Sequence, residues 1–288
     1  MNLETIKTIG VIGSGTMGRG ISICCSSARF KTIVYDISQE ILNNSRTLIQ
    51  KDITKSVEKN KITEENKKDI LLNTEFTSDI NDMHDCDFII EAALEDMDLK
   101  KDLFSRLDSI CRPETILSTN TSSLSITTVS TFVKTNPGRV AGMHFFNPAN
   151  IMKLVEVVRG DFTTEDTINL TTQLSKKLGK VPVTAKDTPA FIVNRIARPF
   201  YGEALKILGE GSADAQLIDN VMKDCGGFVM GPFALMDLIG IDVNFSVTKS
   251  VYEAFFNDPR YRPSFIQKKM VDANLLGRKT KRGFYSYE

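Results

Sequence analysis

Several features that would mark particular classes of protein are scarce or absent in this sequence. Its 288 residues include two histidines and no tryptophan, and its five cysteines form no C-x-x-C pair. The spacing of metal ligands is therefore missing, and no metal site is expected. Lysine plus arginine and aspartate plus glutamate number 36 each, so no net positive field favours nucleic acid or an anionic membrane as a partner. No stretch of about 18 residues is continuously apolar, so no membrane span is predicted.

The cysteine content also bears on the compartment. The count is odd, and the N-terminal residues, which carry Glu4 before a strand-like run, do not resemble a targeting segment. Reduced thiols in the cytoplasm are therefore expected. The remaining composition, 41% hydrophobic and 25% charged, is that of an ordinary globular protein with one large domain or two of average size.

The first two thirds of the chain alternate short apolar runs with longer amphipathic segments. This alternation predicts an α/β fold of Rossmann type, whose mostly parallel sheet carries helices on both faces. After about residue 185 helical periodicity continues without a convincing strand, so residues 1–185 are predicted to form the Rossmann-like domain and residues 186–288 an all-helical domain. The predicted strands lie at 8–12, 31–36, 87–93, 115–120, 139–146, 153–158 and 181–185, and the helices of the first domain at 17–29, 38–73, 97–110 and 164–178.

A glycine-rich motif follows the first predicted strand. Gly13-Ser14-Gly15-Thr16-Met17-Gly18 fits G-x-G-x-x-G, opens a helix and precedes a second strand, as the dinucleotide-binding βαβ unit requires. In that unit the first glycine permits a tight turn, the second lets the backbone approach a pyrophosphate, and the third allows helix and strand to pack closely. The N–H groups at the start of the helix, with Thr16 and Met17, would then face the phosphates. The alternative is a glycine-rich turn without a ligand.

Asp36 ends the second predicted strand, 18 residues after Gly18. A carboxylate at this position accepts hydrogen bonds from the adenosine ribose hydroxyls and repels a 2′-phosphate. The sequence therefore favours NAD over NADP as the cofactor. The alternative is an ordinary acid at the end of a strand.

One histidine and one carboxylate stand out among the later strands. His144 lies at the carboxyl end of the predicted strand 139–146, where open α/β sheets bind their ligands, and a polar turn at Asn147-Pro148 follows it. Glu156 lies between two valines, where a buried carboxylate is costly unless it is paired. Paired with Glu156, His144 could take up and return a proton near neutral pH. The alternatives are a structural histidine and a Glu156 that faces solvent on an edge strand.

Three further polar groups fit such a site without defining it. The segment 120–123, which includes Ser122, follows a strand and should reach the same crevice, although its hydroxyls are also typical helix caps. Asn194, in an apolar helix start, needs a partner on another helix or on a substrate. Lys55 and Lys59 belong to a basic stripe that is either a solvated helix face or a contact for a phosphorylated ligand.

Together these residues resemble the short-chain L-3-hydroxyacyl-CoA dehydrogenase family. The likeness covers essentially the whole chain and is strongest to bacterial members that act on 3-hydroxybutyryl-CoA. The motifs that carry it are Val11–Gly18, Ile90–Glu95, Ser118–Leu124, Val140–Pro148, Met152–Val157, Phe191–Arg195, Met230–Pro232 and the C-terminal segment 277–285.

The resemblance implies a reaction. A protein of this kind interconverts (S)-3-hydroxybutyryl-CoA and acetoacetyl-CoA with NAD(H). His144 matches the family's catalytic histidine, which acts as general acid and base, and Glu156 matches the glutamate that orients it. Ser123 and Asn194 match residues that contact the substrate.

The resemblance also implies cofactor, coenzyme A and subunit contacts. Asn120, Glu95 and Lys100 match positions near the nicotinamide end of the cofactor, and Ser122 is expected beside them. Lys59 and Lys55 match basic residues near the coenzyme A nucleotide. The helical domain is expected to bind substrate and to pair two protomers into a homodimer.

Two positions depart from the family pattern. Asp52 stands where some members carry a serine ahead of the coenzyme A lysine. Gly226-Gly227-Phe228-Val229 stands where close relatives usually carry His-Pro. These departures affect the expected coenzyme A contacts and the packing of the helical domain, and neither touches the proposed proton-transfer pair.

Two other functions remain compatible with the motifs. One is a dehydrogenase of a free hydroxy acid, which would be active without coenzyme A and would not need the lysine stripe. The other is a non-catalytic NAD-binding structural protein on the same scaffold, which would tolerate loss of the His144–Glu156 pair.

Overall fold

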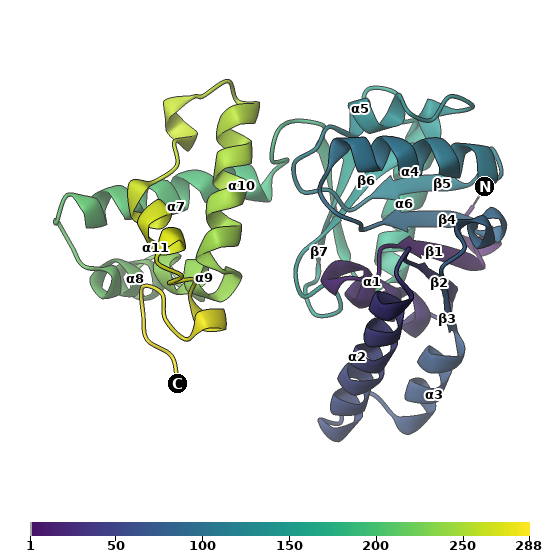
Figure 1. The fold of residues 1–288 in the computed structure, drawn as a ribbon, viewed down its shortest axis with the longest axis horizontal. Helices are drawn as coiled ribbons and strands as arrows, with labels where there is room; N and C mark the ends of the chain where they lie inside the picture. Colours follow the sequence, from purple (N-terminus) through teal and green to yellow (C-terminus); the bar gives the residue numbers. More distant parts are fainter. Residues whose placement is uncertain (1) are drawn as a thin grey trace. The chain divides into compact units, whose positions relative to one another are not determined.

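The computed structural model describes residues 2–288, which form two compact units divided between Thr188 and Pro189. The first unit contains an eight-stranded sheet, and the second is built from helices (Figure 1). The predicted fold class, a Rossmann-type sheet domain followed by a helical domain, is confirmed. In the described part of the chain no helix is both long and apolar enough to cross a membrane.

The sheet has the strand order β3-β2-β1-β4-β5-β6-β7-β8, and only the β6–β7 pair is antiparallel. The first six positions follow the order of dinucleotide-binding folds, in which ligands bind outside the carboxyl ends of the strands. Because β7 runs back against β6, it begins at the edge where the earlier strands end. The strands are β1 (Thr8–Ile12), β2 (Lys31–Tyr35), β3 (Thr74–Thr77), β4 (Phe88–Glu91), β5 (Ile116–Thr119), β6 (Val140–Phe145), β7 (Leu154–Arg159) and β8 (Val181–Lys186).

Strand β3 was not predicted from the sequence. Its four residues, Thr74–Thr77, contain one apolar side chain, Phe76, and none of the four is fully buried. The strand forms the edge of the sheet, where it pairs only with β2. A short, half-exposed edge strand lacks the apolar run that identifies buried strands in a sequence.

Polar side chains fix the starts of the helices that cover this sheet. Ser38, Thr63, Asp96, Ser125 and Thr164 each accept a hydrogen bond from a backbone N–H in the first turn of the helix that follows, which satisfies a donor that has no partner inside the helix. In Figure 1, α4 and α5 lie on one side of the strands and α1 on the other. The helices are α1 (Thr16–Ser27), α2 (Gln39–Glu58), α3 (Glu64–Leu72), α4 (Met97–Ile110), α5 (Ile126–Ser130) and α6 (Glu165–Lys177).

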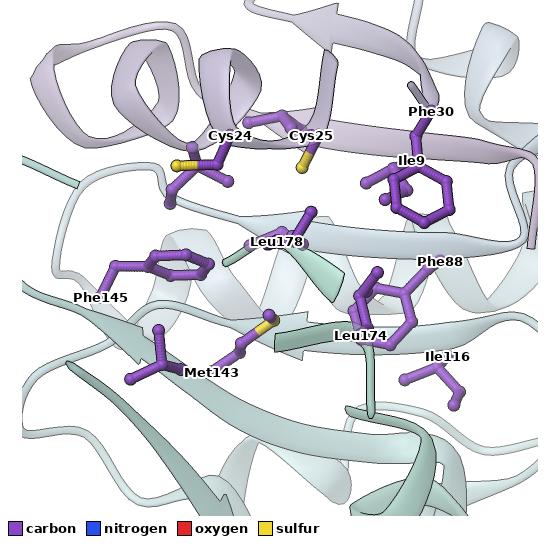
Figure 2. Close-up of a cluster of buried hydrophobic side chains, with 14 of the residues drawn as sticks. Ile9, Cys24, Cys25, Phe30, Phe88, Ile116, Met143, Phe145, Leu174 and Leu178 are labelled. Carbon is purple, nitrogen blue, oxygen red and sulfur yellow. The ribbon is translucent and has the colours of Figure 1, made fainter. Parts of the chain in front are cut away.

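The largest cluster of buried side chains joins α1 and α6 to one face of the sheet (Figure 2). The cluster includes Phe88 and Ile9 from the strands, Cys25 of α1 and Leu174 of α6. Each of these side chains is 0% exposed. Burial of a side chain the size of Phe or Leu contributes about 1.5–3 kcal/mol. This packing holds β1 and its following turn against α1, and so keeps the glycine motif in position.

The second unit is a bundle of five α-helices. Asp214 caps α8, and Pro232 is the first residue of α9. Phe233 and Met236 are fully buried in its core. Asp237, which is 1% exposed, accepts N–H groups from the C-terminal segment and so fastens that segment to α9. The helices are α7 (Val193–Gly209), α8 (Ala215–Asp224), α9 (Pro232–Ile239), α10 (Ile241–Ala254) and α11 (Phe265–Asp272).

Candidate active site

His144 and Glu156 form a buried pair at the carboxyl edge of the sheet. They are direct register partners on β6 and β7, and His144 Nδ1 lies 2.8 Å from Glu156 Oε2. Their side chains are 7% and 1% exposed. The alternative of a solvent-facing Glu156 on an edge strand is therefore wrong, because β7 lies between β6 and β8. The ring of Phe146 packs 4.6 Å from the imidazole, centroid to centroid, and adds to its apolar surroundings.

This geometry suits proton transfer. A carboxylate at Nδ1 holds the imidazole in one orientation and stabilises the charged ring that forms when a proton is taken up at Nε2. Both groups are largely buried, and an electrostatic interaction is stronger in the protein interior than at the surface. The pair can therefore act as a general acid and base toward a ligand at this edge of the sheet.

The glycine motif has the backbone geometry of a dinucleotide-binding turn. Gly13 has φ +90°, a left-handed conformation that favours glycine, and it begins the turn after β1. A Cβ added to Gly18 would lie 1.7 Å from the Gly13 carbonyl oxygen, whereas a Cβ on Gly15 would meet no atom within 4 Å. Gly15 thus leaves open space in front of the first turn of α1, which begins with Thr16 and Met17. Gly15 is the N-cap residue, so no side-chain hydrogen bond caps this turn. A phosphate fits the N–H groups of that turn.

Asp36 follows β2 and faces this turn. Its Oδ2 accepts hydrogen bonds from the Ser14 N–H at 2.9 Å and the Ser14 hydroxyl at 3.1 Å, and its Oδ1 accepts the Ser38 N–H at 3.2 Å. Two carboxylate oxygens offer about four lone-pair positions, so capacity for a further donor remains. Asp36 therefore both fastens the glycine turn to β2 and keeps a negative charge beside it.

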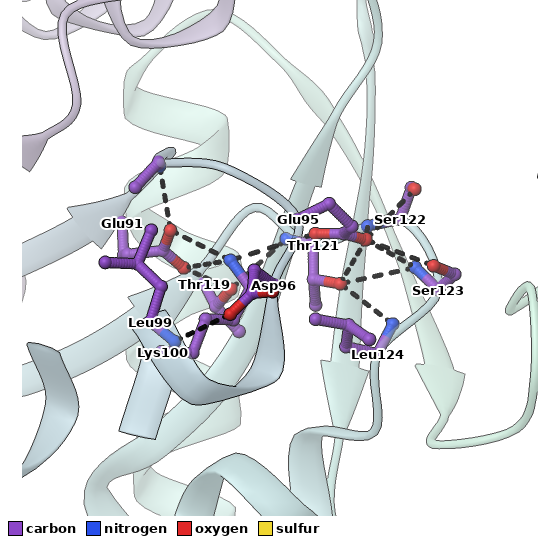
Figure 3. Close-up of polar contacts among 11 residues, drawn as sticks. Glu91, Glu95, Asp96, Leu99, Lys100, Thr119, Thr121, Ser122, Ser123 and Leu124 are labelled. Atoms are coloured by element: carbon purple, nitrogen blue, oxygen red, sulfur yellow. Dashed lines mark hydrogen bonds and ion pairs between the residues drawn. The ribbon is translucent and has the colours of Figure 1, made fainter. Parts of the chain in front are cut away.

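Glu95 accepts hydrogen bonds from several polar groups of the turn that follows β5 (Figure 3). Its Oε1 accepts hydrogen bonds from the Thr121 hydroxyl at 2.6 Å, from the Ser122 N–H at 2.9 Å and from the Ser123 hydroxyl at 3.1 Å. One carboxylate thus orders the whole turn that carries Ser122 and Ser123. Helix α5, which comes next, is capped by Ser125 instead, so the capping interpretation of segment 120–123 is wrong.

Lys100 lies beneath Glu95 and is 1% exposed. Its ammonium lies 2.8 and 2.9 Å from the two carboxylate oxygens of Glu91 and 3.7 Å from Glu95 Oε2. The Thr119 hydroxyl donates to Glu91 Oε2 at 2.6 Å. The sequence placed Lys100 near the cofactor, but in this structure its ammonium group is buried and cannot be contacted from the surface. Glu95, whose side chain is 38% exposed, is the residue of this ion-pair group that reaches the surface.

Glu91 was not singled out from the sequence, although it has the same feature that identified Glu156, namely a carboxylate within an apolar run. It ends a strand of buried apolar residues and is itself 0% exposed. A carboxylate in such a run needs a cation or several donors. Lys100, nine residues later, supplies the cation.

Asn120 links the ends of β5 and β6. Its Oδ1 accepts the Phe145 N–H at 2.8 Å, directly beside His144 in the chain. The structure therefore brings His144, Glu156, Asn120 and the Glu95-ordered turn to one edge of the first unit, together with the glycine turn and Asp36.

The remaining predicted residues belong to the second unit or to α2. Asn194 belongs to the second unit, where its Oδ1 accepts a hydrogen bond from Arg198 Nη2 at 3.5 Å, one turn along the same helix. Lys55 is exposed on α2 and Lys59 is exposed at its end, and neither forms an ion pair with a described residue. Asp52, on the same helix, lies 4.0 Å from Arg19. Among the described residues no group of three or more His, Cys, Asp or Glu side chains is arranged to hold a metal ion.

Two family models match the chain. The model described as "3-hydroxyacyl-CoA dehydrogenase, NAD binding domain" matches residues 8–188, and the model described as "3-hydroxyacyl-CoA dehydrogenase, C-terminal domain" matches residues 191–287. Together they cover nearly all of both units.

Similar proteins and structures carry related names. A 3-hydroxybutyryl-CoA dehydrogenase of Clostridioides difficile is 44% identical over 279 residues, which cover 97% of this chain and 99% of that protein. A 3-hydroxyadipyl-CoA dehydrogenase of Escherichia coli is 44% identical over 282 residues, and the chain spans 98% of its own length but 59% of that protein. A crystal structure of (S)-3-hydroxybutyryl-CoA dehydrogenase from Ralstonia eutropha is 39% identical, with a TM-score of 0.93 over 99% of this chain and 100% of that chain.

Proposed function

Because the chain belongs to the 3-hydroxyacyl-CoA dehydrogenase family and is an NAD-dependent oxidoreductase, we propose that it interconverts (S)-3-hydroxybutyryl-CoA and acetoacetyl-CoA. The observation that carries this proposal is the buried His144–Glu156 pair, at the edge of the sheet that also holds the glycine turn and Asp36. The names of the relatives from Clostridioides difficile and Ralstonia eutropha support the choice of acyl group.

His144 is the proposed general acid and base. In oxidation its Nε2 takes the proton of the 3-hydroxyl group, and in reduction the protonated ring returns a proton to the oxygen on C3. Glu156 stays at Nδ1, fixes the ring and stabilises the imidazolium. The bound cofactor would accept a hydride from C3 as NAD⁺ and return one to C3 as NADH.

Residues of the glycine turn and of the turn after β5 are proposed to hold the cofactor. The open space at Gly15 and the first turn of α1 suit a pyrophosphate, with Gly13, Gly18, Thr16 and Met17 shaping the turn. Asp36 would read the ribose hydroxyls. Glu95, Asn120 and Ser122 would meet the nicotinamide end, with Lys100 behind them as the buried support of Glu95.

Substrate contacts are proposed for four residues, two at the acyl group and two at coenzyme A. Ser123, whose hydroxyl donates to Glu95, offers its oxygen lone pairs as acceptors, and so suits a substrate hydroxyl. Asn194 offers amide donors to an oxygen of the acyl group. Orientation of this kind can lower a reaction barrier by several kcal/mol. Lys55 and Lys59 would hold the phosphates of coenzyme A.

The names of the relatives differ in the acyl chain. That of the Escherichia coli relative specifies an adipyl chain, which has six carbons and ends in a carboxylate. We therefore take the four-carbon substrate as the basal activity and treat the acyl-chain range as a property to be measured.

A direct assay tests the proposed function. Purified protein is mixed with NADH and acetoacetyl-CoA, and the loss of NADH absorbance is followed. Free acetoacetate serves as the control substrate. Turnover of the thioester alone is expected. Equal rates with free acetoacetate would favour a dehydrogenase of free hydroxy acids, and no turnover with either would favour a non-catalytic NAD-binding protein.

A homodimer is proposed for the helical unit. Large apolar side chains remain exposed there, among them Val229 at 95% and Phe256 at 94%. Exposed apolar surface of this kind is typical of subunit contacts. Sedimentation that shows only monomer at micromolar concentration would refute the dimer.

A further inference from the structure

Arg198 is a buried cation without an acidic partner. It lies in α7, one turn after Asn194, and is 5% exposed. The ion pairs of the second unit join Lys206 to Glu203, Lys268 to Asp272 and Lys279 to Asp242, and among the described residues Arg198 takes part in none. A buried charge is costly unless an opposite charge or several hydrogen bonds compensate for it.

The hydrogen bonds of Arg198 leave one side of its guanidinium group available. Nη1 donates to the Asn244 carbonyl at 3.0 Å and to the Thr248 hydroxyl at 3.1 Å, and Nη2 donates to Asn194 Oδ1 at 3.5 Å. Nε is buried and has no acceptor among the described residues. Nε and Nη2 form the edge of a guanidinium group that binds a carboxylate through two parallel hydrogen bonds.

A second donor in the same network also lacks an acceptor. Asn244 Nδ2 is buried and makes no hydrogen bond to a described residue, while Asn244 Oδ1 accepts from Gln267 Nε2 at 2.8 Å. Both unsatisfied groups are therefore N–H donors, on residues that are already joined to each other. Two such donors call for an acceptor, and an anion is the acceptor that would also balance the charge.

A small cavity adjoins Arg198 within the second unit. Its volume of about 10 Å³ is about what one water molecule needs. Arg260 and Arg262 also line it, together with Thr248 and Gln267, and none of the described residues that line it is Asp or Glu. The cavity is therefore electropositive.

Burial lowers the pKa of Arg198 to about 10. The group still carries its charge at neutral pH, so its cost of desolvation remains to be offset. The face of the Tyr201 ring, 5.0 Å from the guanidinium carbon, offsets part of it.

We propose that Arg198 is a receptor for a carboxylate at the far end of the acyl chain, so that the protein prefers 3-hydroxyacyl-CoA thioesters of dicarboxylic acids. This inference rests on the proposed function, because Asn194, to which Arg198 is hydrogen-bonded, is proposed there to contact the acyl group. Four residues advance about 6 Å along an α-helix, a distance that a few methylene groups span. A six-carbon diacid chain matches this separation, whereas a four-carbon chain ending in methyl does not reach.

The test compares three thioesters in the reductive direction with NADH. 3-Oxoadipyl-CoA and 3-oxohexanoyl-CoA have equal chain lengths and differ in the terminal carboxylate, and acetoacetyl-CoA reports the basal activity. We expect kcat/KM of the wild type to be at least roughly tenfold higher for 3-oxoadipyl-CoA than for 3-oxohexanoyl-CoA. Arg198→Met should reduce this ratio to about one or below, and Arg198→Lys, which keeps the charge but loses the fork, should give an intermediate ratio.

Controls separate the possible failures. Lys223→Met removes a cation from the exposed face of α8 and should leave the ratio unchanged. The readout is the ratio of kcat/KM for the two six-carbon substrates. A general loss of activity caused by displacement of Asn194 lowers both values and cancels in this ratio. A wild-type ratio near one, with acetoacetyl-CoA reduced normally, overturns this inference and leaves the proposed function intact. Absence of turnover with all three thioesters overturns both.

A free small anion is the competing occupant. If acetate raises the melting temperature of the wild type but not of Arg198→Met, while the ratio of the two six-carbon substrates is near one, the cavity binds a free anion and the proposal is overturned. The wild-type ratio decides the matter even if Arg198→Met fails to fold.

Discussion

His144 on β6 and Glu156 on β7 lie directly opposite each other, with Nδ1 and Oε2 2.8 Å apart. Twelve residues separate them in the chain, and the register of one antiparallel strand pair brings them together. A slip of one residue would turn Glu156 to the other face of the sheet. The proposed catalytic pair therefore depends on the register of β6 and β7 as well as on the two side chains.

Replacement of the histidine should separate catalysis from cofactor binding. In His144→Gln the general acid and base is lost, while the glycine turn and Asp36 remain. We expect turnover of acetoacetyl-CoA to fall by roughly two or more decades, with NADH affinity measured by calorimetry near that of the wild type. A variant that keeps near wild-type turnover would remove His144 from the mechanism.

Replacement of the glutamate should have a related but distinct effect. Glu156→Gln keeps the size of the side chain and removes the charge that stabilises the imidazolium, so kcat should fall by roughly one to three decades with a smaller change in KM. Glu165→Gln, at a position 67% exposed, is the matched control and should be near neutral. Equal kcat in the two variants would contradict the orienting role.

Asp36 should determine the choice between NADH and NADPH. Asp36→Ala removes the charge that repels a 2′-phosphate and also releases Ser14, so NADH should bind several-fold more weakly while the preference over NADPH narrows. Ser14→Ala keeps the carboxylate and should keep the preference. Comparison of KM for both cofactors checks this, and an unchanged preference in Asp36→Ala would show that the residue does not read the ribose.

Replacement of Lys100 should reduce the free energy of unfolding, and replacement of its exposed neighbour Lys101 serves as the control. Lys100→Met leaves the buried Glu91 carboxylate without its cation, and loss of one partner of a buried pair costs about 3–5 kcal/mol in the free energy of unfolding. Lys101 is exposed, so Lys101→Met should change that free energy by less than about 0.5 kcal/mol. Denaturant unfolding of both variants provides the measurement, and similar midpoints would argue against the buried pair.

Asp108 should contribute to the loss of stability in acid. Burial alone raises its pKa, but hydrogen bonds from Thr135, Arg139 and the Lys134 N–H outweigh burial and lower the pKa from its ordinary 3.8. The folded protein thus binds this proton less tightly than the unfolded chain does. The contribution of Asp108 to stability is complete above the unfolded pKa and is lost as the pH falls through the folded pKa.

The Asp108→Asn variant tests this acid dependence. Its free energy of unfolding should be lower than that of the wild type near neutral pH, and should fall less steeply as the pH drops below about 4. Asp102→Asn, at a position 64% exposed on the same helix, is the control and should follow the wild type. Parallel curves for wild type and Asp108→Asn would refute the assignment.

Much of the fold follows from signals within a few residues of one another. The buried strands are apolar runs, the helix starts carry capping side chains such as Ser38 and Asp96, and the glycine motif with Asp36 lies within one βαβ unit. Such signals can be read locally because their physical causes, backbone conformation and helix capping, are local. β3 escaped prediction because its pairing with β2, and not its composition, makes it a strand.

The sequence by itself determined the alternating order of strands and helices in the first unit apart from β3, the cofactor class through the glycine turn and Asp36, and the residue types that could transfer a proton. Only the tertiary structure decided which partners those residues have. It joined His144 to Glu156 through strand register, buried Lys100 against Glu91, and left Arg198 without an acid in the helical unit. Burial and charge pairing depend on contacts between distant segments, and these form only when the sheet and the helical bundle are assembled.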